Sequence, residues 1–237
     1  PDLDHILLSA QALYLVSDGG SRPHLEAGSF GWVLATHEET LATCGGPVTG
    51  IPISSYRCEA MGRLSALLFL QRYCTQQDLR PPCSIHTYLD NTSVIYTEAD
   101  LSGHPTLYPS VALASDIDVF LELLQVHRRL SWLTLTTHHV KAHQDDSTSF
   151  DLLSRPAQLN VVADAIATEV LDTMETAATP PTLPLPAGRV HLFHENALIV
   201  RRQVQTLRHG LADTQIREYL CQRFSWTKDQ YYLIDWL

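Results

Sequence analysis

Lysine is nearly absent from this sequence, since Lys141 and Lys228 are the only two among 237 residues. Arginine raises the basic total to 16, against 26 acidic residues, so the formal net charge is −10 at pH 7. A protein that holds nucleic acid through phosphate contacts usually shows the opposite balance. The composition therefore argues against strong electrostatic binding of nucleic acid by the chain as a whole.

Cysteine pairs and long hydrophobic runs are also missing. The five cysteines are odd in number and include no C-x-x-C pair. This argues against a zinc site and a disulfide framework, and favours reduced thiols in an intracellular compartment, the cytoplasm or the nucleus. No run approaches the roughly 18 apolar residues of a membrane span, and no segment resembles a signal peptide. We therefore expect no membrane partner.

The residues that are present have the composition of a globular protein, with 45% hydrophobic and 18% charged residues. The length allows one domain plus an appendage, or two small domains. The sequence starts on Pro1 rather than Met and stops at Leu237 without a polar tail. We therefore expect it to be a piece of a longer polypeptide.

Strand and helix patterns alternate over the first three quarters of the chain. Three strands, ending near residues 18, 36 and 44, are joined by short links, which predicts an antiparallel meander. A helix at 57–75 is apolar nearly all round and should be buried on more than one side. The later predicted elements are a strand at 84–89, a helix capped by Asn91, a helix at 114–130, a strand at 133–140 and a helix at 161–175 capped by Asn160.

This order predicts an α/β fold with a mixed five-stranded sheet flanked by helices. A right-handed crossover would place the fourth strand parallel to the first and beside it. We expect this domain to cover residues 12–176. A proline-rich linker follows at 177–188, because proline at that density blocks helices and strand pairing. Residues 189–237 are predicted to form a small hairpin and two short helices (213–224 and 227–236), whose role the sequence does not indicate.

Four acidic residues are notable for their positions. Asp18 and Asp90 are predicted to end adjacent parallel strands, where such sheets bind ligands. Glu59 opens the buried helix, and Asp164 is predicted in the first turn of the last helix. Individually, each could be a turn, a cap or a favourable charge at a helix start. Together beside a hydrophobic core they would repel one another unless a cation were present, and four carboxylates suit two magnesium ions.

Five motifs carry a family resemblance: "SDGG", "RCEAMG" at a helix start, "YLDNTSV", "VKAHQD" and "LNVVADAIA", in this order. With these motifs the chain resembles the ribonuclease H family (type 1), in particular the ribonuclease H domains of retrotransposon reverse transcriptases. The resemblance implies that Asp18, Glu59, Asp90 and Asp164 bind two Mg²⁺ ions, for which Mn²⁺ can substitute. It also implies that His143 moves protons or helps product release. The predicted substrate contacts are Gly19, Gly20, Ser21 and Asn91.

Two departures from the family pattern matter. Ala142 stands where the family usually has glycine, and alanine disfavours positive φ, so the His143 loop could adopt a different conformation. No lysine- and tryptophan-rich basic protrusion is visible either. Because the chain is acidic, we expect affinity for RNA–DNA hybrid to come from a covalently linked reverse transcriptase domain.

Other basic and aromatic residues favour ordinary structural roles. On a strand, His138 and His139 would point to opposite faces, which argues against a zinc site shared with His143. The Arg128–Arg129 pair is expected at a solvated helix end. The aromatic residues from Trp226 to Trp236 are expected to pack the tail against the main domain or a missing neighbour rather than to stack on bases.

The leading hypothesis is a metal-dependent endonuclease that hydrolyses the RNA strand of RNA–DNA hybrids, with Glu59 as an acceptor for the 2′-hydroxyl that distinguishes RNA from DNA. One alternative is a non-catalytic connector with a ribonuclease H-like fold in a retroelement reverse transcriptase. The intact carboxylates argue against it, whereas the acidic charge and Ala142 argue for it. A second alternative is a nuclease of the same fold that acts on DNA.

Overall fold

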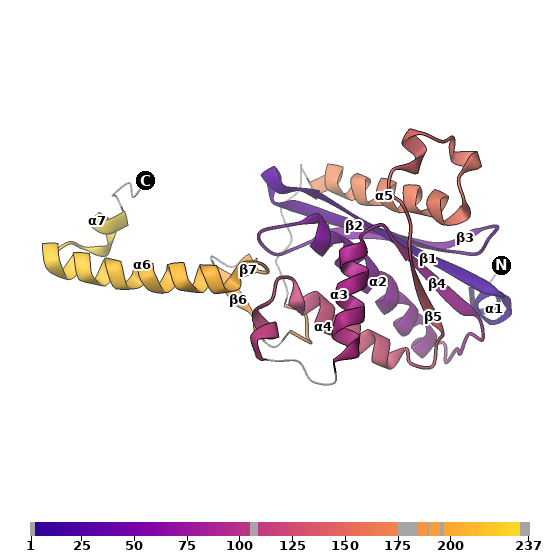
Figure 1. Cartoon of the computed structure of the whole chain (residues 1–237), viewed down its shortest axis with the longest axis horizontal. Helices are drawn as coiled ribbons and strands as arrows, with labels where there is room; N and C mark the ends of the chain where they lie inside the picture. Colours follow the sequence, from indigo (N-terminus) through magenta and orange to yellow (C-terminus); the bar gives the residue numbers. More distant parts are fainter. Residues whose placement is uncertain (1–2, 105–108, 175–183, 189, 195–196, 233–237) are drawn as a thin grey trace.

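The computed structural model of the chain describes residues 3–104, 109–174, 184–188, 190–194 and 197–232. Its centre is a twisted sheet of five strands in the order β3-β2-β1-β4-β5, with helices on both faces (Figure 1). The strands are β1 (Ala12–Arg22), β2 (Ala27–Ala35), β3 (Thr40–Val48), β4 (Ser84–Leu89) and β5 (Leu135–His139).

Strand directions agree with the expected fold. β1, β2 and β3 form an antiparallel meander, while β4 pairs parallel to β1 and β5 pairs parallel to β4. The predicted fold class, a mixed five-stranded sheet with antiparallel and then parallel strands, is therefore confirmed.

Helices cover the two faces of the sheet unequally. α5 packs on β1, β2 and β3 on one face, and α2 packs on β1 and β2 on the other, where α3 and α4 extend the layer. The bounds of these helices, with the short N-terminal α1, are α1 (Leu3–Ser9), α2 (Ser55–Gln76), α3 (Thr92–Gly103), α4 (Ile117–Arg129) and α5 (Arg155–Met174). α1 precedes the predicted domain start at residue 12, and its Leu7 is fully buried in the main core.

Several predicted element boundaries were wrong, three of them in β1, β3 and α5. β1 does not end at Asp18 but continues to Arg22, because Asp18 through Arg22 still pair with β2. β3 is longer than expected and includes Gly45, Gly46 and Pro47. α5 begins at Arg155, six residues before the predicted start, and follows two short 3₁₀ turns.

The C-terminal part contains a small hairpin and two helices. β6 (Leu192–His194) and β7 (Ala197–Ile199) pair antiparallel, as expected. α6 (Gln203–Phe224) begins ten residues earlier than predicted and is a single long helix that projects from the body, with α7 (Lys228–Tyr232) at its far end (Figure 1). The predicted linker lies outside the described residues at 177–183.

This C-terminal part is attached to the body through β7 and the residues next to it. Leu198, Ile199 and Val200 are buried. The Ile51 N–H donates to the Leu198 carbonyl (2.8 Å), and the Val200 N–H donates to the Ile51 carbonyl (2.9 Å). The hairpin is thereby joined to the loop that precedes α2. No helix in the described part of the chain is both long and apolar enough to cross a membrane.

Candidate active site

Asp18 lies within β1 at the point where the parallel pairing with β4 stops. The last parallel pair is Val16 with Tyr88, and β4 ends one residue later at Leu89. Beyond that level β1 pairs with β2 but no longer with β4. Asp18 is 7% exposed, and its Oδ1 accepts the Gly19 N–H (2.6 Å).

Asp90 follows β4 directly and precedes α3. Asn91 caps that helix, as predicted, because its Oδ1 accepts the N–H groups of Ser93 (3.1 Å) and Val94 (3.3 Å). A ring nitrogen of His139 lies 3.0 Å from the Asp90 carbonyl oxygen. β4 and the α3 cap thus fix the backbone that carries the Asp90 carboxylate.

Glu59 projects from the first turns of α2. Ser54 caps this helix by accepting the Arg57 N–H (3.2 Å), so the helix starts two residues earlier than predicted. Glu59 is 4% exposed. Its backbone is close to β1, because a Cβ placed on Gly19 would lie 2.3 Å from the Glu59 nitrogen.

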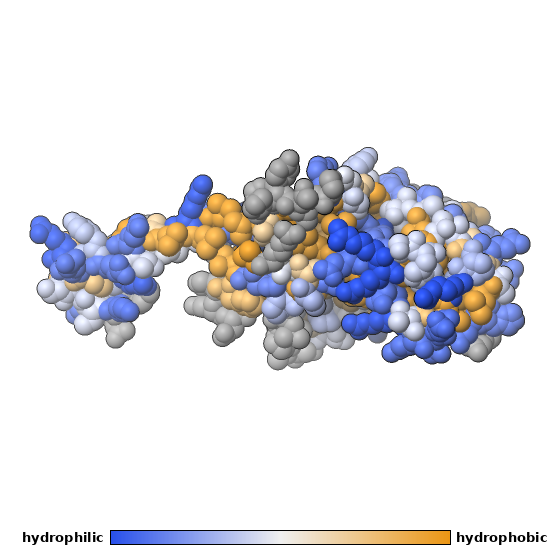
Figure 2. All heavy atoms as spheres, turned by 90° about the horizontal axis from the view of Figure 1, so that it is seen from below, coloured by the Kyte–Doolittle hydropathy of each residue, from blue (hydrophilic) through white to orange (hydrophobic). Residues whose placement is uncertain are grey.

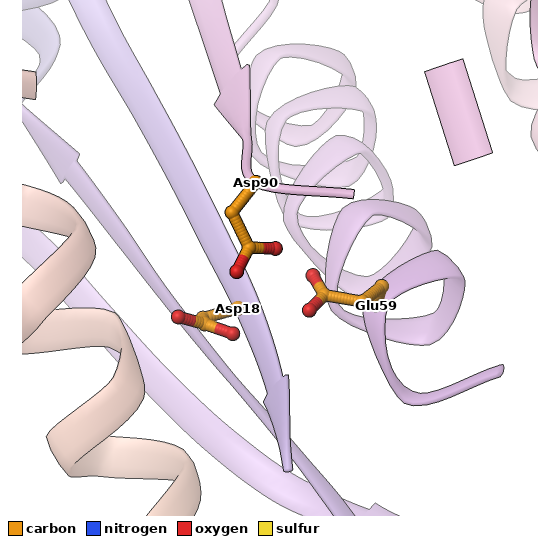
Figure 3. A group of neighbouring side chains, drawn as sticks. All are labelled: Asp18, Glu59 and Asp90. Carbon is orange, nitrogen blue, oxygen red and sulfur yellow. The ribbon is translucent and has the colours of Figure 1, made fainter. Parts of the chain in front are cut away.

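These three carboxylates converge, although they come from different layers. Asp18 is on the side of β1 that α5 covers, whereas Glu59 belongs to the helix on the other side. They can meet because β4 ends before this level, and Asp90 occupies the space beyond its end. One carboxylate oxygen from each residue lies within 4.8 Å of the other two (Figure 3).

Asp164 and His143 line the pocket into which the three carboxylates project. The pocket has a volume of about 470 Å³, and its lining consists of the three carboxylates and seven neighbours: Gly19, Gly20, Ser55, Asn91, Thr92, His143 and Asp164. The four predicted acids and the loop histidine therefore share one cavity. Ser21, the remaining predicted substrate contact, is partly exposed on β1 beside it.

Asp164 does not lie where the sequence placed it within its helix. Because α5 starts at Arg155, Asp164 is in the middle of the helix rather than in its first turn. A favourable charge at a helix start therefore does not account for Asp164. Asn160 is also not a cap: it is 4% exposed, and its Nδ2 donates to Asp18 Oδ2 (3.2 Å).

Burial and mutual repulsion make these carboxylates costly to ionise. Burial, together with the charges of Asp90 and Asp164, raises the pKa of Asp18 to about 6. Burial and the charges of Asp18 and Asp90 raise the pKa of Glu59 well above its usual range. Burial also raises the pKa of Asp164, which the charge of His143 counteracts in part. Positive charge placed in this pocket would favour ionisation of all of them.

The loop that carries His143 tolerates alanine at position 142. The residue with a left-handed backbone in this loop is His143 itself (φ 49°). Ala142 is absent from the positive-φ residues of the described chain, so its side chain imposes no backbone strain there. The departure from the family pattern therefore does not keep His143 from the pocket.

Gly19 and Gly20 have packing roles that the sequence did not indicate. A Cβ on Gly19 would overlap the α2 backbone, and a Cβ on Gly20 would lie 2.9 Å from Leu171 of α5. The two glycines thus let helices approach both faces of β1. Contact of these residues with a substrate remains a prediction.

Comparisons with known proteins concern the fold. No protein-family model and no curated protein matches the chain. Similar solved structures include a ribonuclease H1 from compost, LC11, in complex with RNA/DNA hybrid (15% identity, 69% of this chain and 99% of that one, TM-score 0.49). Ribonuclease H1 of the archaeon Halobacterium salinarum is 18% identical and covers 68% of this chain and 98% of its own (TM-score 0.44).

A viral protein is also similar to the chain. The prototype foamy virus protease–reverse transcriptase is 16% identical over 70% of this chain, which corresponds to 21% of the viral chain (TM-score 0.47). Each of these likenesses is distant and concerns the fold alone. Similarity this distant does not extend to residue roles.

Proposed function

We propose that this chain is a metal-dependent endonuclease that hydrolyses the RNA strand of RNA–DNA hybrids. The observation that carries the proposal is the convergence of Asp18, Glu59 and Asp90 within 4.8 Å in a pocket that Asp164 and His143 also line. A buried group of carboxylates with raised pKa values is unfavourable for stability alone. Its persistence is explained if the group binds cations.

The donor set fits magnesium, with manganese as a substitute. Both prefer oxygen ligands, and magnesium is usually held by a few carboxylates together with substrate phosphate. Glu59 Oε2 and Asp90 Oδ1 are buried and lack a hydrogen-bond partner among the described residues. These unpaired acceptors are the atoms that a bound cation would satisfy. Asp164, on the same pocket, would complete a site for two ions.

Each residue has a role in this proposal. When bound, two divalent ions supply the charge that activates a water molecule and stabilises the departing 3′ oxygen. Asp18, Glu59, Asp90 and Asp164 would hold that charge in place, and Glu59 would also accept the 2′-hydroxyl hydrogen bond. Asn160 would keep Asp18 oriented through its amide. His143, on an exposed loop, would transfer a proton or assist product release.

The substrate contacts and the linked partner belong to the same proposal. Gly19, Gly20, Ser21 and Asn91 would contact the sugar–phosphate backbone beside the carboxylates. The chain would act as part of a retroelement polyprotein, covalently linked to a reverse transcriptase domain. The net charge of −10 supports a second candidate, a non-catalytic connector in such a polyprotein, because it disfavours binding of a polyanion.

Cleavage assays on three matched duplexes test the function. The full chain should cut the RNA strand of an RNA–DNA hybrid with Mg²⁺ or Mn²⁺ and should be inactive in EDTA. RNA–RNA and DNA–DNA duplexes of the same sequence should remain intact. Cleavage of the DNA duplex instead would indicate a DNA nuclease, and absence of cleavage on all three with either metal would favour the connector.

A further inference from the structure

α6 is an exposed arm. It projects from the body beyond its buried first residue, Gln203, and α7 packs against its outer end (Figure 1). We use "arm" for Arg201, Arg202 and α6. Seen from below, apolar residues gather where the arm leaves the body, and hydrophilic residues predominate at its outer end (Figure 2).

The arm reverses the charge of the chain. Residues 1–200 contain 10 basic and 22 acidic residues, whereas the arm, residues 201–224, contains 5 basic and 2 acidic ones. The acidic total that argued against phosphate binding is therefore a property of the body. The basic residues that the body lacks are concentrated on a projecting helix.

Two arginines of α6 lie on one face of the helix with other exposed polar residues. At 3.6 residues per turn, positions separated by three or four residues share a face. We define the basic face by Gln205, Arg208, His209, Tyr219 and Arg223, all of which are exposed. Glu218 lies off this face by the same periodicity. Arg208 and Arg223 are 15 residues apart, which corresponds to about 22 Å along the helix.

The base of the arm lies at the same end of the molecule as the carboxylates. Arg57, two residues before Glu59, pairs with Asp118 (2.8 Å) and Asp116 (3.4 Å). Asp116 in turn pairs with Arg201 of the arm (3.5 Å), and its N–H donates to the Val200 carbonyl (2.7 Å). The first turn of the helix that carries Glu59 and the start of the arm are therefore held by the same buried charges.

We propose that the basic face of α6 binds the phosphate backbone of an RNA–DNA hybrid and supplies affinity that the acidic body lacks. Arginine binds phosphate in a bidentate geometry, and Tyr219 and Gln205 can donate hydrogen bonds to phosphate oxygens. The choice of an RNA–DNA duplex rests on the proposed function.

The apolar residues of the arm suggest an alternative occupant, a protein. Val204, Leu207 and Leu211 are 43%, 39% and 66% exposed and lie on another side of α6. Such a stripe could dock in a groove of a protein, for example a second copy of this chain. The charge of the arm favours nucleic acid as the occupant, because a protein docked on the apolar stripe would not contact the arginines of the basic face.

Binding in EDTA separates affinity from cleavage. We would measure fluorescence anisotropy of an end-labelled 20-base-pair RNA–DNA hybrid with the full chain, over a range of salt concentrations. The variant Arg208→Gln/Arg223→Gln should bind about five- to tenfold more weakly at low salt, with a salt slope shallower by about 2. The control Arg128→Gln/Arg129→Gln removes equal charge at the exposed end of α4 and should change affinity less than twofold.

Three outcomes would overturn the proposal. The original chain could fail to bind the hybrid at low salt, the arm variant could keep the original affinity, or both variants could lose affinity equally. Sedimentation velocity on the same samples tests the protein alternative, because a dimer that Leu207→Ser/Leu211→Ser dissociates would assign the arm to a second copy. A chain that binds through the arm but cleaves no duplex would refute the proposed nuclease and leave this proposal standing.

Discussion

Asp18 and Gly19 are consecutive residues of β1 whose side chains face opposite layers. Asp18 faces α5, where Asn160 donates to its carboxylate, while the missing side chain of Gly19 leaves space for the α2 backbone. The pair therefore determines how closely Glu59 approaches Asp18. A single methyl group at position 19 would push apart two of the three converging carboxylates.

We predict that Gly19→Ala destabilises the fold and impairs cleavage together. Its Cβ would lie 2.3 and 2.4 Å from backbone atoms of Glu59 and Cys58, which cannot rotate away. Overpacking of this kind costs about 1–3 kcal/mol. The same change at Gly103, where no atom lies within 4 Å, should be neutral or stabilising. Urea denaturation and cleavage rates would check both variants, and an unaffected Gly19→Ala protein would contradict the packing argument.

Asp90→Asn tests metal binding against a purely structural role. The substitution keeps the side-chain size but removes one of the charges that raise the pKa of Asp18 and Glu59. The metal-free variant should therefore melt at an equal or higher temperature. Cleavage should fall by several orders of magnitude, because the site loses an anionic ligand. The stabilisation by magnesium should also be smaller than in the original protein.

The control for this variant is Asp100→Asn, an exposed carboxylate on α3 ten residues after Asp90. It should leave the cleavage rate, the melting temperature and the magnesium effect unchanged. Near-original cleavage by Asp90→Asn would refute the catalytic assignment of this carboxylate.

At the scale of elements, a buried ion pair joins helices to strands. Arg63 of α2 pairs with Glu98 of α3 and donates to Thr87 of β4 (2.9 Å) and Thr137 of β5 (2.8 Å). His127 of α4 also contacts Glu98. Burial alone would raise the pKa of Glu98, but the charges of Arg63 and His127 outweigh it and hold this pKa at about 2.

We predict that Glu98→Gln costs about 3–5 kcal/mol at pH 7, because it leaves a buried arginine without its counter-charge. The folded-state pKa of Glu98 is below its usual value of 4.5. Its stabilising contribution is therefore complete above pH 4.5 and is lost as the pH falls toward 2. Urea denaturation at pH 7 and pH 3 should show a smaller difference between variant and original protein at pH 3. A difference that stays constant would contradict this.

The sequence predicted elements well where a local pattern dominated. The alternating strands and the caps at Asn91 and Ser54 act within a few residues, and the first of these caps was predicted. β3 was cut short because Gly45, Gly46 and Pro47 disfavour strands locally. In the structure, however, a Cβ on Gly45 would overlap Ile166 of α5, so the glycine is there for helix packing. That contact is tertiary and has no local signal.

In the candidate site, too, residues with a local sequence signal were predicted, and a residue placed by tertiary structure was missed. The four acids and His143 were predicted from motifs, and the structure places all five on one pocket. Asn160 was missed as a site residue because asparagine before an apolar run is typical of a helix cap. Its real position depends on the start of α5 at Arg155, where Pro156 is tolerated in the first turn because that N–H has no helical partner.

At the scale of the whole molecule, part of the C-terminal tail belongs to the body. The burial of Leu198, Ile199 and Val200, with the hydrogen bonds at Ile51 and Asp116, ties residues 198–200 to the loop before α2 and to the start of α4. The short segment at 184–188 also packs on the body, since the Ala187 N–H donates to Glu122 (2.9 Å). Only the arm stands apart.

Two truncations separate the contribution of the docked segment to stability from that of the arm. A chain that ends after Gln203 keeps the docked segment and should retain the melting temperature and cleavage at saturating substrate. A chain that ends after Met174 loses three buried apolar side chains, each worth about 1.5–3 kcal/mol of burial, and should melt at a lower temperature. Thermal denaturation of both proteins checks this. Equal melting temperatures would show that the tail contributes nothing to the stability of the body.

The segregation of charge has a kinetic consequence. With 22 acidic residues before position 201 and a basic helix beyond it, the molecule carries a permanent electric dipole that runs from body to arm. Near any polyanion, repulsion of one end and attraction of the other exert a torque, so the arm arrives first. Long-range orientation of this kind accelerates encounter and is screened beyond about 10 Å at 0.1 M salt. Ionic strength should therefore slow association more than it speeds dissociation.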